Sequence, residues 1–212
     1  MFNLIRKDIL VTYSNKLTVF MILLYFPLIL LIMGKNDINS IFMFTAVSFV
    51  FITTKVPFSY EIRDKPQILI QSLPIKKIDI VLSKYIGIIL NFGLATVYTL
   101  IYMGIANATG FINMNTIKIS TILVTFGFTI LALSLSMPMQ FSFTPKVANF
   151  ANMLLYVIII NIIIIEEEKI FKFLNLDFSN LDNILIIAGS ILGVYLISIV
   201  ISMILYKNRK FY

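Results

Sequence analysis

The fold is decided by the stretch between residues 17 and 56, which reads LTVFMILLYFPLILLIM-GKND-INSIFMFTAVSFVFITTKV. It contains two apolar runs, residues 17–33 and 38–56, with only a short polar turn between them. Each run falls in the range of about 17–25 residues that a transmembrane helix needs. Backbone polar groups find no water inside a bilayer, so both runs are predicted to be helices. The stretch therefore predicts a helical hairpin that crosses a membrane twice.

Four further apolar runs of similar length follow, at residues 85–108, 117–139, 147–165 and 184–206. The composition points the same way, because 59% of the 212 residues are hydrophobic and 13% are charged. A soluble domain averages about 45–50% apolar and about 25% charged residues. We therefore expect an all-α membrane protein, a single domain over residues 1–212 with six transmembrane helices.

The basic residues predict the orientation of these spans. Six spans place both ends of the chain on one side of the membrane. If that side is the cytoplasm, only four of the 17 basic residues lie outside, and the other thirteen lie inside; the four are Lys35, Lys118, Lys169 and Lys172. Positive residues gather on the cytoplasmic side, so both termini are predicted to be cytoplasmic. The net charge of +7 is then a topology signal, and we expect no nucleic-acid partner.

The first 16 residues precede the first span and have an amphipathic pattern. Apolar side chains recur every three or four positions, with basic residues on the other faces; the apolar ones are Phe2, Ile5, Ile9 and Tyr13. This pattern predicts a helix over residues 1–16 that lies in the cytoplasmic interface of the membrane lipid. The alternative is a positively charged flank that only orients the first span.

The inside connection between the second and third spans, residues 57–84, is much longer than a turn requires. It contains the mixed-charge stretch Tyr60-Glu61-Ile62-Arg63-Asp64-Lys65, then Pro66, and later Leu73-Pro74. Each proline disfavours helix at the residue before it, so the two prolines bracket a short element. We expect a docking element for a partner; the alternative is a connector whose lysines bind lipid headgroups.

The outside connection between the fifth and sixth spans, residues 166–183, begins with three glutamates. Six large apolar residues follow among its polar ones, which a solvated loop does not need. We expect one or two short amphipathic helices resting on the outer interface.

The chain lacks the side chains of common catalytic sites. It has no Cys and no His, which removes thiolate nucleophiles, the commonest general base and the commonest metal ligand. It also has no Gly-x-x-x-x-Gly-Lys-Ser/Thr motif to hold nucleotide phosphates. We therefore expect no enzyme activity, no metal and no cofactor in this chain, and any ATP-driven step must use another polypeptide. Because the spans hold essentially no ionisable residue, an ion-coupled carrier is disfavoured.

Neutral polar residues are arranged along the faces of two spans. In the fourth span, Thr121, Thr125 and Thr129 share one small-polar face, which favours helix packing. In the fifth span the shared face holds Asn149, Asn152 and Tyr156. Amide side chains are costly against lipid, so this face either lines a substrate cavity or packs against another helix.

One segment resembles a known family. The sequences Leu69–Lys77 (LIQSLPIKK) and Ile80–Tyr85 (IVLSKY) resemble the LLxSLP-basic and IVxxKY stretch of small type-2 ABC export permeases. The resemblance is specific over about residues 58–86, and the layout of the whole chain is similar. It implies that Tyr60 to Asp64 form a coupling helix seated in a cleft of a separate cytosolic ATPase, which binds ATP and Mg. It further implies a bacterial cell membrane and a second permease, as homodimer or heterodimer.

The resemblance also assigns roles within the spans. In that family the second and fifth spans help line the path, so Phe42 and Phe49 are candidates for an apolar cavity wall; the alternative is that they are simply buried. Such permeases dimerise mainly through the first and fifth spans. The Gly189 and Gly193 pair of the sixth span, a Gly-x-x-x-Gly motif, is therefore expected to pack within the protomer.

Size and Ile/Lys/Asn-rich composition look like exporters of amphipathic, membrane-active peptides, including phenol-soluble-modulin exporters. The resulting expectation is a permease subunit that moves amphipathic or hydrophobic peptides, such as toxins, bacteriocins or modulins, out of the cell. The alternative is a non-transporting immunity or assembly factor that binds membrane-active peptides.

Overall fold

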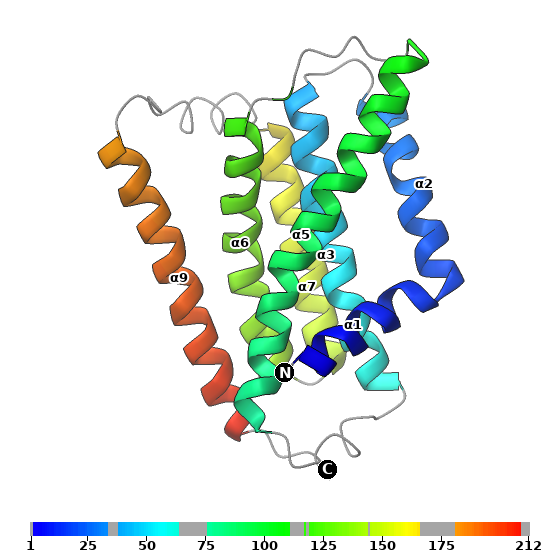
Figure 1. Cartoon of the computed structure of the whole chain (residues 1–212). Coiled ribbons are helices and arrows are strands. Elements are labelled where there is room, and N and C mark those ends of the chain that lie inside the picture. The colour runs from blue at the N-terminus through cyan, green and yellow to red at the C-terminus, as the bar shows by residue number, and fades with distance from the viewer. Residues whose placement is uncertain are drawn as a thin grey trace. The chain divides into compact units, whose positions relative to one another are not determined.

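The computed structural model describes residues 2–33, 38–63, 76–110, 117, 119–143, 145–165 and 181–208. Within these ranges every regular element is an α-helix, which confirms the all-α class. Figure 1 shows their order. The helices are α1 (Phe2–Ser14), α2 (Lys16–Met33), α3 (Ile38–Arg63), α5 (Lys77–Ala108), α6 (Ile119–Ser142), α7 (Pro145–Ile165) and α9 (Leu181–Asn208).

Five of the described helices are long and apolar enough to cross a membrane: α3, α5, α6, α7 and α9. A sixth span is reached when α1 and α2 are taken together, although this pair is bent by 70°. The chain is thus a multi-pass membrane protein, and its six-span layout stays a prediction. The bend agrees with an N-terminal helix that is distinct from the first apolar run.

The helices extend beyond the predicted spans at the connection between α3 and α5. Helix α3 does not end at Val56 but continues through Pro57 to Arg63, and α5 begins at Lys77 instead of Tyr85. A proline removes one helical hydrogen bond, and a well-packed membrane helix tolerates that loss. The segment predicted as an inside loop, residues 57–84, therefore includes the ends of two long helices.

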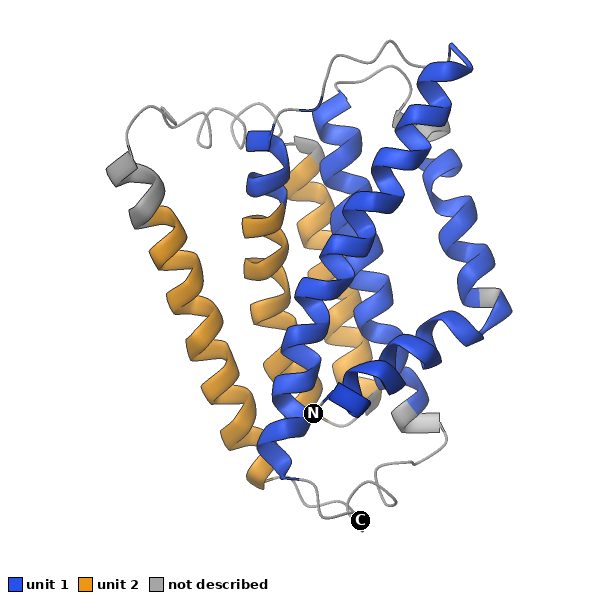
Figure 2. Ribbon diagram, viewed as in Figure 1, with its two compact units in different colours: residues 1–125 blue, residues 126–212 orange. Residues whose placement is uncertain are grey.

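The described chain forms two compact units, residues 1–125 and 126–212 (Figure 2). In the first unit, α3 packs against α1, α2 and α5, and α1 also contacts α2 and α5. Its core is a cluster of apolar side chains from α2, α3 and α5: Phe26, Ile29, Ile41, Phe42, Ala46 and Met103. Helix α3 is the most deeply buried of the five candidate spans.

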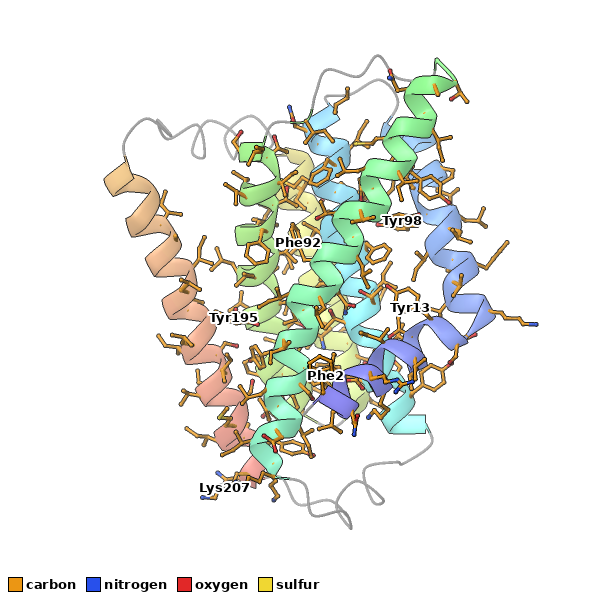
Figure 3. All side chains as sticks on the ribbon, viewed as in Figure 1. Phe2, Tyr13, Phe92, Tyr98, Tyr195 and Lys207 are labelled. Atoms are coloured by element: carbon orange, nitrogen blue, oxygen red, sulfur yellow. The ribbon has the colours of Figure 1, made fainter. Side chains whose placement is uncertain are left out.

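Two tyrosines of α5 bind backbone carbonyl groups of α2 beside Pro27. Proline has no N–H, so Pro27 leaves the carbonyl of Leu23, four residues earlier, without its helical donor. The Tyr102 hydroxyl donates to that carbonyl at 3.3 Å, and the Tyr98 hydroxyl donates to the carbonyl of Ile22 at 2.5 Å. The two tyrosines therefore hold α2 at its proline. Tyr98 is labelled in Figure 3.

In the second unit, α9 packs along α6. The contacts recur about every two turns on both helices: Gly127 with Ile191, Ser134 with Ser198, and Phe141 with Tyr206. The order of the partners is the same on both helices, so α6 and α9 run parallel. This is the relation that alternate spans of a hairpin-connected bundle must have.

Candidate functional site

The described charged groups that are best enclosed lie where α1 meets α3 and α5. The Lys84 ammonium is 3.1 Å from the Asp8 carboxylate, and the two side chains are 5% and 14% exposed. The same ammonium lies over the ring of Phe58, 4.6 Å from its centre. A carboxylate and the electron-rich face of an aromatic ring both attract an ammonium group. Together these three residues connect α1, α5 and the end of α3.

A second contact joins the same region to the start of α2. Asn15, between α1 and α2, donates through Nδ2 to the hydroxyl of Tyr60 at 2.6 Å. Tyr60 is half-buried and lies in the last part of α3. The N-terminal helix is therefore fixed at both its middle and its end, and we call Asp8, Asn15, Phe58, Tyr60 and Lys84 the α1 cluster.

The sequence of α1 explains how Asp8 reaches this position. Ile5 and Thr12 are the buried residues of the helix, and Asp8 lies between them on the same face, one turn from each. The Thr12 hydroxyl donates to the Asp8 carbonyl at 2.8 Å, which removes its own need for an outside partner. Of the predicted apolar face, Phe2, which is labelled in Figure 3, is 86% exposed, so the face that docks on the protein is rotated toward Asp8. Whether α1 also lies in lipid stays a prediction.

The predicted coupling residues are only partly within the described structure. Tyr60 belongs to the α1 cluster. Glu61, Ile62 and Arg63 form the last turn of α3, but their side chains are outside the described set. Four further predicted positions lie outside the described residues: Asp64, Lys65, Leu73 and Pro74.

The two phenylalanines proposed for a cavity wall are packed in the first unit. Phe42 is 0% exposed in the core cluster, and Phe49 is 4% exposed, with its ring centre 5.0 Å from that of Tyr98. In this conformation neither presents an open apolar surface. Burial, the alternative that the sequence left open, describes both residues here.

The polar face of α7 divides into three environments. Asn149 is exposed, Tyr156 is half-buried and Asn152 is fully buried. The Oδ1 atom of Asn152 accepts a hydrogen bond from the Ser136 hydroxyl of α6, 2.5 Å away. Its Nδ2 atom is buried without a hydrogen-bond partner among the described residues. Asn152 thus packs against α6 and keeps one buried donor without a partner among the described residues, whereas Asn149 is exposed.

The predicted packing residues differ in outcome. Thr121, Thr125 and Thr129 are all buried, and the Thr121 hydroxyl lies 2.9 Å from Oδ1 of Asn39 in α3. The Thr125 hydroxyl bonds the carbonyl of Thr121 in its own helix at 2.7 Å.

The expectation that Gly189 and Gly193 pack within the protomer stays a prediction. A Cβ at either would meet no described atom within 4 Å, so neither makes a close helix contact within the described chain. That contact belongs to Gly127, where a Cβ would lie 2.9 Å from Cδ1 of Ile191. The Gly-x-x-x-Gly spacing indicates where a close approach can occur, but the helix rotates another face toward α6.

Sequence reasoning missed Asp8 and Gly127. A usable signal existed for Asp8, because it is the only acidic residue before Asp37 and falls among the apolar residues of an amphipathic helix. Lys84 entered the sequence argument as one of the inside basic residues and as part of the IVLSKY stretch, and no partner within the chain was predicted for it. No group of three potential metal ligands from Asp, Glu, His or Cys occurs in the described part of the chain.

A bundle of apolar, membrane-crossing helices with a charged cluster at one end of α3 and α5 is typical of a multi-pass membrane subunit. The chain belongs to a family of ABC transporter membrane proteins: the family model described as ABC-2 family transporter protein matches residues 3–207. This confirms the type-2 ABC permease family, whereas the peptide-exporter subgroup stays a prediction. No curated protein and no solved structure matches the chain. Membership implies an ABC ATPase subunit as partner, and membrane subunits of this family are generally non-catalytic permeases.

Proposed function

We propose that this protein is the permease subunit of an ATP-driven exporter, moved by separate cytosolic ATPase subunits that bind ATP and Mg. The family match over residues 3–207 supports a permease, and the sequence contains no phosphate-binding loop of its own. The ATPase docks at the end of α3 and α5 that carries the α1 cluster. Most basic residues of the chain belong to that side under the orientation that the charge distribution predicts.

The observation that carries this proposal is the continuity of α3 from the membrane span to Arg63. Residues 60–63 of the proposed coupling element belong to the same helix as the most deeply buried span. A push on the adjoining segment then moves the cytoplasmic end of α3. That segment includes Asp64, Lys65, Leu73 and Pro74. The helix is continuous across Pro57, so the push passes along a single element.

Amphipathic or hydrophobic peptides are the proposed cargo. The described buried polar groups of the second unit are neutral: Thr129, Ser134, Ser136, Gln140, Asn152, Ser198 and Ser202. Neutral donors and acceptors among apolar side chains suit a peptide whose charges stay outside and whose carbonyl groups need donors. Asn152 is the preferred contact because its Nδ2 atom is a buried donor without a partner among the described residues.

A second permease completes the proposed transporter, either another copy of this chain or a sister subunit. Two permeases would bring two ATPases together, so that closure of the ATPase pair on ATP acts on both coupling elements. The size of the assembly, measured after purification in detergent, distinguishes a homodimer from a heterodimer.

Charge reversal in the last turn of α3 tests the coupling role. Glu61→Lys and Arg63→Glu are expected to abolish ATP-dependent peptide export while leaving membrane insertion intact, because the ATPase contact loses its charge pattern. Lys146→Glu, at an exposed position at the start of α7, is the matched control and is expected to retain export. Normal ATP-stimulated export by both coupling variants would refute the assignment.

The cargo contact has its own pair of variants. Asn152→Leu removes the buried donor, whereas Asn161→Leu removes an exposed amide that donates to the carbonyl of Val157 in its own helix. Export of a labelled amphipathic peptide is expected to fall in the first variant and to persist in the second. Equal export by the two variants would contradict a role of Asn152 in cargo binding.

A further inference from the structure

Helix α1 is attached to both helix ends that flank the proposed coupling segment. Asp8 binds Lys84 of α5, and Asn15 binds Tyr60 of α3. Helix α3 ends at Arg63 and α5 begins at Lys77, so the coupling segment lies between two elements that α1 holds. Any displacement of those two ends is resisted by α1 or shared with it.

The chemistry of the Asp8–Lys84 pair is unusual for a simple anchor. Lys84 is the only charged residue among the described ones that is buried. Taking two charges out of water costs free energy that their attraction only partly returns, and well-packed apolar residues often stabilise equally well. What an ion pair adds is a single preferred register, because the charges must meet in one geometry.

The environment of the pair reinforces that register. The Lys7 ammonium lies 3.4 Å from the other carboxylate oxygen of Asp8, and the Lys84 ammonium also lies over the ring of Phe58. The Lys7 side chain is 35% exposed, so it contributes less than the enclosed Lys84. Lys84 on α5 therefore contacts α1 and α3 at once. A shift of α1 breaks its contact with Asp8, and a shift of α3 breaks its contact with Phe58.

We propose that Asp8 and Lys84 are positioning residues that make α1 move as one body with the ends of α3 and α5. This inference rests on the proposed function, since it names the route by which the ATPase stroke spreads. A push on the coupling segment then reaches α2 as well, through α1 and the bend at Asn15. The N-terminal helix then transmits movement of the coupling segment to α2.

The first test uses the chain alone and does not depend on the ATPase. The protein has no Cys, so spin labels can be attached at Leu10→Cys and Ile78→Cys, two positions that are 57% and 51% exposed. In lipid nanodiscs the label distance is expected to be narrowly distributed with Asp8 and Lys84 present. It is expected to broaden in Asp8→Asn, where the buried ammonium loses its anionic partner. An unchanged, narrow distribution in Asp8→Asn would overturn the proposal even if export proves to be ATP-driven.

The second test measures peptide exported per ATP hydrolysed, with the ATPase bound. The double variant Asp8→Leu/Lys84→Met keeps an apolar contact but no ion pair, and its ratio is expected to fall about fivefold or more, the lower range of energetic coupling between sites. The exchanged pair Asp8→Lys/Lys84→Asp restores an ion pair and is expected to recover part of the loss. The recovery is only partial because a carboxylate, unlike an ammonium, is not attracted to the ring face of Phe58. A wild-type ratio in the apolar double variant would show that the ion pair only anchors α1.

The two tests also separate failure of this inference from failure of the proposed function. If no form of the protein, wild type included, binds an ATPase, the proposed function is refuted. The label distances then decide by themselves whether the ion pair holds α1 to α5.

Discussion

The tyrosine pair beside Pro27 allows a prediction in which one substitution cancels the effect of another. Tyr102 donates to the carbonyl of Leu23, the group that Pro27 leaves without a helical donor. Pro27→Ala restores a backbone N–H at that position, so the helix itself can satisfy the carbonyl. Tyr102→Phe should therefore destabilise the wild-type protein and should have almost no effect in the Pro27→Ala background.

The expected magnitude follows from hydrogen bonds between membrane helices. Measured values in membrane proteins average about 0.6 kcal/mol and reach about 1.7 kcal/mol. The 3.3 Å distance is long for a hydroxyl donor, which places Tyr102→Phe near the average, at about 0.6 kcal/mol. Because the restored N–H removes the need for the hydroxyl, the interaction free energy between the two substitutions should be about the same size.

The assay is a double-mutant cycle of unfolding free energies, measured by circular dichroism during titration with a denaturing detergent. Tyr98→Phe provides the matched control, because Tyr98 donates to the carbonyl of Ile22, which Pro27 does not orphan. Its cost should be the same with proline or alanine at position 27. If Tyr102→Phe costs as much in the Pro27→Ala background as in the wild type, the hydroxyl does not act as the substitute donor.

Two predictions concern the parallel packing of α6 and α9. Gly127→Leu should destabilise the protein by about 1–3 kcal/mol because its side chain meets Ile191, whereas Gly193→Leu, with open space around it, should cost far less in the same detergent titration; equal costs would contradict the packing. Ser198→Ala should lose the 2.6 Å hydrogen bond that joins the two helices, about 0.6–1.7 kcal/mol, whereas Ser190→Ala, whose hydroxyl bonds its own helix, should be nearly neutral; a neutral Ser198→Ala would show that this bond adds nothing.

The helical class was predictable because it follows from the length and hydrophobicity of the apolar runs. Inside a bilayer no water can bind the backbone groups of residues 17–33 or 38–56, and a helix satisfies these groups internally. Their helices could therefore be inferred without knowing any contact. Helix ends were harder to place. The second apolar run ends at Val56, but a helix need not end where its apolar run ends, and α3 continues to Arg63.

The candidate site was less predictable because it depends on helix rotation. Phe2, Ile5, Ile9 and Tyr13 define an apolar face by spacing alone, yet the docked face is centred on Asp8. An apolar pattern reports which residues avoid water and does not distinguish lipid from protein as their neighbour.

The packing role of the Gly189 and Gly193 pair could not be settled from its spacing for the same reason. The Gly189 and Gly193 pair satisfies a packing motif in the sequence, but α9 directs another face to α6, and Gly127 receives a side chain that no local pattern indicates. Long-range contacts of this kind are fixed by the neighbouring helices, which a single stretch of sequence does not describe.

The proposed function requires that this chain move cargo only when a separate ATPase acts on it. The decisive experiment reconstitutes the purified protein in lipid vesicles with a fluorescently labelled amphipathic peptide, either alone or together with its partner ABC ATPase. We expect peptide transport that requires both the ATPase and hydrolysable ATP, and none with the chain alone. Transport of the peptide by the chain alone, at a rate that ATPase and ATP do not change, would contradict this dependence.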